Sequence, residues 1–167
     1  MWTLLIGIAL AASPWDGLQS DVVVSRTVPA PATEVYARLT DLRQLEAMFP
    51  DDCAQDWTYG EVTSGVGAQV TMTYKWSLAR RRLAATITNG EEGRWFDLDH
   101  HGDKGFVTRF RLEPLTGGTR VEATTYVDAP PWPVRGRYFM RVRPMWAFCY
   151  SRLLGNLERV VSGSEPR

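Results

Sequence analysis

Residues 70–76 read Val-Thr-Met-Thr-Tyr-Lys-Trp, and every second side chain in this stretch is apolar. Successive side chains of a β-strand point to opposite faces of the sheet, so the apolar residues share one face: Val70, Met72, Tyr74 and Trp76. The stretch therefore predicts a half-buried strand with one inner face.

The same period of two recurs between Ala54 and Asp128. The predicted inner face also carries Leu83, Ala85, Ile87, Phe96, Leu98, Phe106, Phe110, Leu112, Val121, Ala123 and Val127. Charged residues fall on the opposite face, among them Asp97, Asp99, Arg109 and Arg111. Turn signals separate the runs at residues 65–67, 89–90, 102–103 and 116–118. Short strands at this spacing are typical of consecutive hairpins, and they predict an antiparallel meander.

Segments on both sides of the meander have other periodicities. Residues 21–28 (DVVVSRTV) predict a first strand, which Pro29 ends. Residues 33–45 have helical spacing that breaks near Thr40-Asp41, so we expect two short helices before Pro50. Residues 145–161 predict a long terminal helix with one apolar stripe: Trp146, Cys149, Leu153, Leu157 and Val160. Pro144 either begins this helix or kinks a longer one.

This order of elements predicts an α+β fold. A curved antiparallel sheet of about seven strands wraps around the long C-terminal helix, and the two short helices follow the first strand. We expect one domain at residues 21–162, an apolar leader and linker at 1–20, and a short tail at 163–167. One helix cannot fill the concavity of a strongly curved sheet, so we expect an apolar cavity between them.

The leader contains the apolar run WTLLIGIALAA at residues 2–12. This run is too short to span a bilayer as a helix, which needs about twenty residues. Its length fits the apolar region of a secretory signal, although no Lys or Arg precedes it and Pro14 follows closely. The sequence favours export or N-terminal membrane tethering over a cytoplasmic protein whose apolar start docks on the domain.

Charge and cysteine usage exclude some functions. The net formal charge is zero, which argues against nucleic acid as a partner. Cys53 and Cys149 form no Cys/His cluster, so we expect no structural zinc, and a disulfide between them requires an exported protein. No Ser-His-Asp set, phosphate-binding glycine loop or HExxH motif is recognisable, and we expect no cofactor.

Several local motifs together resemble a known superfamily. Residues 22–41, VVVSRTVPAPATEVYARLTD, are similar to the opening of polyketide cyclase/dehydrase-type members of the START-like (SRPBCC) superfamily. Phe49-Pro50, Val66-Gly67 and the closing LLGNLE at 153–158 add to the resemblance, whereas Met48 stands where the family commonly has Trp. The similarity extends over residues 21–161 and implies the helix-grip fold. That fold hosts carriers, cyclases, hydrolases and chaperone-like proteins, so it does not decide the function.

We expect the cavity to bind a hydrophobic small molecule such as a lipid, an isoprenoid or a polyketide. The candidate ligand-binding residues are Trp57, Tyr59, Met72, Tyr74, Trp76, Phe96, Leu98, Phe106, Phe110, Trp146, Cys149 and Leu153. The first alternative is a cyclase/dehydratase-type enzyme that uses the same cavity. The second is a protein-interaction role with the cavity filled by side chains.

His100 and the arginine-rich segment carry two further hypotheses. His100 shares the parity of Phe96 and Leu98 and could enter the cavity as an acid or base, but its place at a hairpin end favours exposure to solvent. We nominate no catalytic residue. Four arginines near aromatic side chains could contact an anionic membrane surface: Arg135, Arg137, Arg141 and Arg143.

Overall fold

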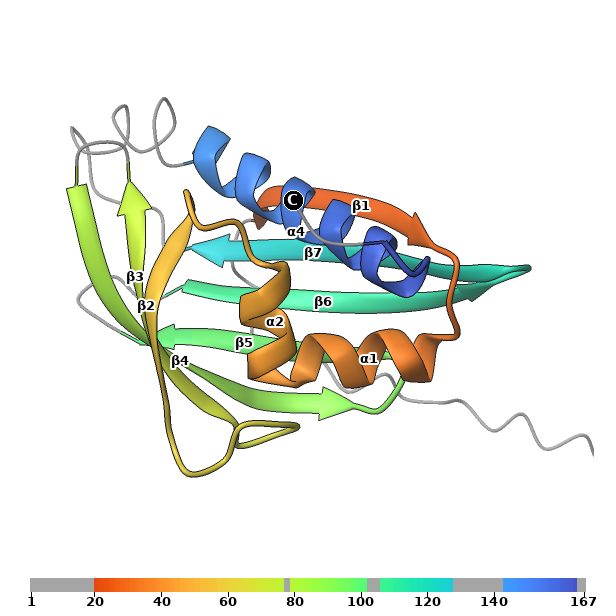
Figure 1. The fold of residues 1–167 in the computed structure, drawn as a ribbon, viewed down its shortest axis with the longest axis horizontal. Helices are drawn as coiled ribbons and strands as arrows, with labels where there is room; N and C mark the ends of the chain where they lie inside the picture. Colours follow the sequence, from red (N-terminus) through yellow and green to blue (C-terminus); the bar gives the residue numbers. More distant parts are fainter. Residues whose placement is uncertain (1–19, 77–78, 102–105, 128–142, 165–167) are drawn as a thin grey trace, which may run out of the picture.

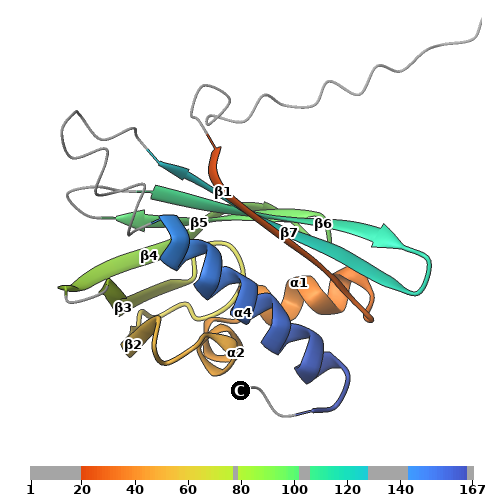
Figure 2. The same cartoon turned by 90° about the horizontal axis from the view of Figure 1, so that it is seen from above.

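The computed structural model describes residues 20–76, 79–101, 106–127 and 143–164. Within them, seven strands form one antiparallel sheet and three helices lie on the same side of it (Figures 1 and 2). The elements in chain order are β1 (Ser20–Val28), α1 (Ala32–Thr40), α2 (Leu42–Met48), β2 (Ala54–Tyr59), β3 (Gln69–Trp76), β4 (Ala79–Glu91), β5 (Trp95–His101), β6 (Phe106–Leu115), β7 (Gly118–Val127) and α4 (Arg143–Val161). The predicted α+β fold is confirmed.

The strands are ordered β1-β7-β6-β5-β4-β3-β2 across the sheet. All neighbouring strands are antiparallel, as the meander predicted. Strand β1 lies at one edge of the sheet, and α1 and α2 carry the chain across to β2 at the other edge (Figure 1). The meander then returns strand by strand until β7 pairs with β1.

The core lies between the inner face of the sheet and the helices. Figure 2 shows α4 lying across the concave side of the sheet, with α1 and α2 on that side as well. The predicted stripe of α4 is buried at Trp146, Cys149, Leu153 and Leu157. Inner-face residues of the strands are buried against it, so the assignment of faces from the period of two is confirmed.

Asp41 separates the two short helices at the predicted break. Its carboxylate accepts hydrogen bonds from the backbone N–H groups of Arg43, at 3.0 Å, and Gln44, at 3.4 Å. Asp is among the residues preferred at this position, because its side chain satisfies N–H groups that have no partner within the first turn. The acidic residue therefore ends α1 and begins α2.

One predicted turn lies elsewhere. Residues 89–90 fall inside β4, and the chain turns instead at Gly93, whose φ of 69° is in the left-handed region. The pairing of β4 with β5 shifts between Ile87 and Asn89, so Thr88 is the bulged residue, and Asn89 and Gly90 continue the ladder opposite Asp97 and Phe96. The turns at Gly65, Gly67 and Gly117 are confirmed by positive φ, and residues 102–105 lie outside the described part of the chain.

A disulfide joins Cys149 of α4 to Cys53, which precedes β2. Both cysteines are buried. The bond closes a loop across a sequence separation of 96 residues, and restricting so long a loop in the unfolded chain contributes about 4–5 kcal/mol in the chain-entropy picture. The long helix is therefore tied covalently to the β2 edge of the sheet.

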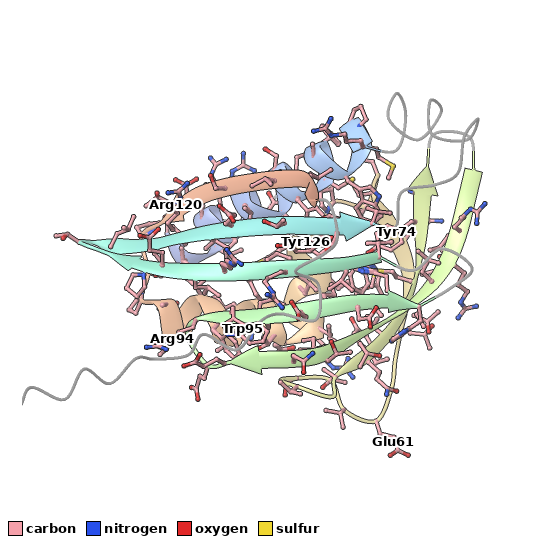
Figure 3. All side chains as sticks on the ribbon, turned by 180° about the vertical axis from the view of Figure 1, so that it is seen from behind. Glu61, Tyr74, Arg94, Trp95, Arg120 and Tyr126 are labelled. Atoms are coloured by element: carbon pink, nitrogen blue, oxygen red, sulfur yellow. A yellow bond between two sulfur atoms is a disulfide. The ribbon has the colours of Figure 1, made fainter. Side chains whose placement is uncertain are left out.

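An ion pair is buried on the outer face of the sheet. Arg109 of β6 donates to both carboxylate oxygens of Asp97 on β5, at 2.7 and 2.8 Å. The residues are directly opposite in the ladder and only 7% and 0% exposed, respectively. The guanidinium also lies 4.7 Å from the ring centroid of Trp95, which is labelled on this face in Figure 3. The sequence placed both charges on the face opposite the apolar one and did not predict that they are buried as a pair.

We predict that Asp97→Ala destabilises the fold by about 3–5 kcal/mol, because it removes the carboxylate that accepts two hydrogen bonds from the buried guanidinium of Arg109. The double change Asp97→Leu with Arg109→Met should lose much less, since no buried charge remains. Urea unfolding followed by circular dichroism measures both. Glu91→Ala is the control: it removes the exposed partner of Arg94 and should change stability by less than about 1 kcal/mol. A similar small loss for Asp97→Ala would contradict the prediction.

Candidate functional site

Most of the predicted ligand-binding residues meet between the sheet and α4. Nine are buried there: Met72, Tyr74, Phe96, Leu98, Phe106, Phe110, Trp146, Cys149 and Leu153. Trp57 and Tyr59 of β2 are partly buried against this core. The side chain of Trp76 lies outside what the structure describes. The structure thus brings most of the set together, and their contact with a ligand stays a prediction.

An aromatic cluster occupies the part of this core nearest the N-terminal end of α4. We define it as Tyr74, His100, Phe106, Trp146 and Tyr150. Tyr74 lies 4.8 Å from Trp146 between ring centroids, and the ring of His100 stacks on Phe106 at 4.0 Å. Trp146 also stacks on Tyr150 at 5.6 Å. Strands β3, β5 and β6 therefore contribute one ring each, and α4 contributes two.

Two groups of hydrogen-bonded polar atoms lie among these rings. The hydroxyl of Tyr74 is 2.8 Å from Nε2 of His100. The hydroxyl of Tyr150 is 2.7 Å from Oγ1 of Thr108, which is also 3.2 Å from Oγ1 of Thr125. Both groups are buried, so their hydrogen bonds act in a medium of low polarity.

His100 is in the interior rather than in solvent, which corrects the expectation from its place at a hairpin end. Its side chain is 1% exposed and points to the same inner face as Phe96 and Leu98, as its position two residues after Leu98 predicted. Burial lowers the pKa of His100 to about 3, although interactions with the backbone of Phe106 and Leu98 oppose part of this fall. No hydrogen bond of acceptable geometry forms at Nδ1, which is buried without a partner.

The buried phenols are also held in their neutral form. Burial raises the pKa of Tyr74 well above its ordinary value, and Tyr150 adds to this rise. Burial raises the pKa of Tyr150 as well, while hydrogen bonds from Thr108 and Thr125 oppose the shift. The titratable side chains of the aromatic cluster are therefore uncharged at neutral pH.

Tyr59 and Cys149 are engaged by other parts of the protein. Tyr59 donates its hydroxyl hydrogen to the carboxylate of Glu46 on α2, and the guanidinium of Arg43 lies 4.6 Å from the centroid of its ring. Burial, followed by the hydrogen bond to Glu46, raises the pKa of Tyr59 to about 12. The sulfur of Cys149 is taken up by the disulfide. Only their apolar parts are available to a ligand.

Sequence reasoning missed Tyr150 and Phe49. Tyr150 lies one turn after Trp146 on α4 and is fully buried, and this spacing of four could have included it in the stripe. Phe49 follows α2, and its ring packs edge-on against Tyr74, Tyr150 and Trp57. The Phe49-Pro50 pair is part of the family resemblance, but no periodicity in the sequence indicates that the ring of Phe49 faces the core.

Other predictions fall partly outside the described residues. Arg135, Arg137, Arg141 and the leader at residues 1–19 are in undescribed segments, and Arg143 is exposed at the start of α4. Within the described ranges, no cluster of three metal-ligating side chains forms. No described helix is long and apolar enough to cross a membrane.

Comparison with known proteins gives a family match and several structural neighbours. The family model described as "Polyketide cyclase / dehydrase and lipid transport" matches residues 19–162. No curated protein matches the sequence significantly.

Solved structures share the fold at low sequence identity. The solution structure of KanY protein superposes with a TM-score of 0.74 and 17% identity over 88% of this chain and 99% of that one. TTHA0849 from Thermus thermophilus has a TM-score of 0.70 and 20% identity over 86% and 99%. DynU16, from the dynemicin biosynthetic locus, has a TM-score of 0.59 and 16% identity over 89% and 50%.

We predict that stability falls as the pH is lowered from about 6.5 toward about 3 because of His100. Its pKa is lower in the folded than in the unfolded chain, so the unfolded state binds the extra proton in this window. The stabilising contribution of neutral His100 is fully present above pH 6.5. Below that pH, the free energy of unfolding falls by at most about 1.4 kcal/mol per pH unit.

The measurement compares unfolding free energies of the wild type and His100→Phe between pH 7 and pH 4. The difference between the two curves isolates the contribution of His100 from that of carboxylates, which titrate in the same pH range. His101→Gln is the control for the loss of a histidine at the neighbouring position, since His101 is exposed on the opposite face, and it should keep the fall in stability that His100→Phe removes. Parallel curves for wild type and His100→Phe would refute the assignment.

Proposed function

Because this chain belongs to the polyketide cyclase/dehydrase and lipid transport family, we propose that it binds or transports a hydrophobic small molecule between the sheet and α4. A lipid, an isoprenoid or a polyketide-like compound would suit the site. Contacts would come from the apolar residues named above, with the aromatic cluster at one end.

The observation that carries this proposal is the nature of the inner face. Rings and aliphatic side chains from β3, β5, β6 and α4 converge there, and their titratable members are neutral. Ligand sites of this kind are lined mainly by apolar groups with a few polar atoms for orientation. The described rings contact one another, so a guest would enter between rings that shift apart; changes of rotamer on binding are common.

A cyclase/dehydratase-type enzyme is the second candidate. The buried Tyr74, His100 and Tyr150 are the observation in its favour, because such a reaction needs groups that move protons inside the site. A base would take one proton from the CH2 group between two carbonyls, and the resulting carbanion would add to a third carbonyl, whose π bond breaks to an alkoxide that takes up that proton. Loss of the second proton of the former CH2 group together with the new hydroxyl would then release water and leave a carbon–carbon double bond.

A contact with membranes would complement a carrier role. Arg135, Arg137, Arg141 and Arg143 precede or begin the long helix and lie near aromatic residues in the sequence. Basic side chains attract the anionic surface of a bilayer by roughly 1 kcal/mol each. Export through the predicted leader would be compatible with the Cys53–Cys149 disulfide, since such bonds persist in oxidising compartments.

We predict that the purified protein carries a hydrophobic compound that native mass spectrometry detects and organic extraction releases. Returning the compound to the protein distinguishes the two candidates: an unchanged mass supports binding or transport, and cyclisation with loss of water supports the enzyme. The intact mass also reports whether the leader has been removed and whether the two cysteines are joined. A protein that carries nothing and takes up no added lipid, isoprenoid or polyketide would remove the proposal.

We also predict that the protein sediments with vesicles of anionic lipid and not with neutral ones. Replacing Arg135, Arg137 and Arg141 together by Ala should abolish the difference, because the attraction is electrostatic. Replacing Arg80, Arg81 and Arg82 by Ala is the matched control, with the same loss of charge at the β3–β4 hairpin. Equal sedimentation with both lipids, or loss of binding in the control alone, would exclude the proposed contact.

A further inference from the structure

In the hydrogen-bonded pair of Tyr74 and His100, one polar side-chain atom has no hydrogen-bond partner. Nε2 of His100 is occupied by the Tyr74 hydroxyl at 2.8 Å, whereas Nδ1 is buried without a hydrogen-bond partner. Thr88 Oγ1, at the register shift of β4, is the other such atom among the described residues. An unsatisfied buried polar group is unfavourable, so a native structure that keeps one needs a physical reason.

The second group of polar atoms in the interior, the hydroxyls of Thr108, Thr125 and Tyr150, has no atom without a hydrogen-bond partner. Thr108 lies within hydrogen-bonding distance of both Tyr150 and Thr125, so these hydroxyls satisfy one another. They act as a structural link between α4 and strands β6 and β7. His100 is different. Its ring is held by stacking on Phe106 and by the hydrogen bond with Tyr74, and Nδ1 makes no hydrogen bond of good geometry, although the backbone of Phe106 and Leu98 interacts with the imidazole.

The described side chains place no charge in this part of the interior. Among them, the buried charged residues are Asp97 and Arg109, and these face the opposite side of the sheet. The ion pair of Arg26 and Glu158 lies at the exposed edge of α4. A carboxylate placed beside His100 would find no counter-charge among the described side chains, and burying an unpaired charge is strongly unfavourable.

We propose that Tyr74 and His100 form the hydrogen-bonding anchor of the ligand site, and that the ligand is an uncharged molecule whose apolar, ring-sized body carries a hydroxyl or carbonyl oxygen. This inference rests on the proposed function and narrows it. It excludes fatty acid carboxylates as the preferred ligand, and it excludes pure hydrocarbons, which would leave Nδ1 unsatisfied.

The two tautomers of the imidazole lead to the same class of ligand. If the Tyr74 hydroxyl donates to Nε2, then Nδ1 carries the proton and donates to a ligand oxygen. If Nε2 donates to Tyr74, then Nδ1 accepts from a ligand hydroxyl. In both arrangements the partner is a neutral oxygen atom that reaches the edge of the His100 ring from the side not occupied by Tyr74.

Three probes with one ring skeleton test the inference: naphthalene, naphthol and naphthoate. Their dissociation constants are measured by titration calorimetry with the full chain after organic extraction of any bound compound. Naphthol should bind about fivefold more tightly than naphthalene, although naphthalene is the more hydrophobic, because it satisfies Nδ1. Naphthoate should bind most weakly of the three.

Two variants test whether the preference for naphthol over naphthalene depends on His100 and Tyr74. His100→Phe keeps a stacked ring without nitrogen and should abolish the preference for naphthol over naphthalene. Tyr74→Phe should reduce it, and it carries the test if His100→Phe does not fold. His101→Phe is the matched control, because this exposed neighbour faces the other side of the sheet, and it should keep the wild-type order of affinities.

The outcomes separate this inference from the proposed function. Equal binding of naphthol and naphthalene, tightest binding of naphthoate, or an unchanged preference in both anchor variants would overturn the anchor and leave hydrophobic binding intact. Failure of all three probes to bind would overturn the anchor as well, and together with the absence of a co-purified compound it would remove the proposed function.

Discussion

The apolar inner face of the sheet must be kept from water, and the rest of the structure follows from how α4 covers it. An antiparallel sheet with one apolar face needs a second layer, and α4 is the long helix of the described chain. Its position is fixed at several points. The disulfide ties Cys149 to Cys53, the Asn156 amide donates to the carbonyl of Met48 at 2.9 Å, and Glu158 pairs with Arg26 of β1.

The alternating pattern was enough to predict the inner face, because the side to which a strand residue points depends only on its parity. It could not predict how deeply the outer face is buried. Asp97 and Arg109 are twelve positions apart in sequence, and they meet because the β5–β6 register places them directly opposite each other. Neither local propensity nor hydrophobic period contains that register, so the sequence could not predict that these two charges form a buried pair.

For His100, two local signals disagreed and tertiary packing decided between them. Parity directed the side chain inward, and the nearby hairpin end suggested solvent. In the fold, Phe106 from the paired strand stacks on the imidazole, and Trp146 from α4 lies 6.2 Å from it between centroids. Tyr150 was missed for a related reason: a sheet that curves around a helix contacts more of its circumference than the narrow stripe that sequence spacing identifies.

The neutrality of the interior bears on the choice between binding and catalysis. A general base works best when its pKa is near the operating pH, and burial lowers the pKa of His100 to about 3, far below that range. The same burial makes the phenol of Tyr74 a weak acid. Such a pair orients a neutral oxygen well and exchanges protons poorly. Proton transfer at this site would require the ligand to bring polar groups or water that raise the pKa of His100. Without that change, the geometry favours recognition over reaction.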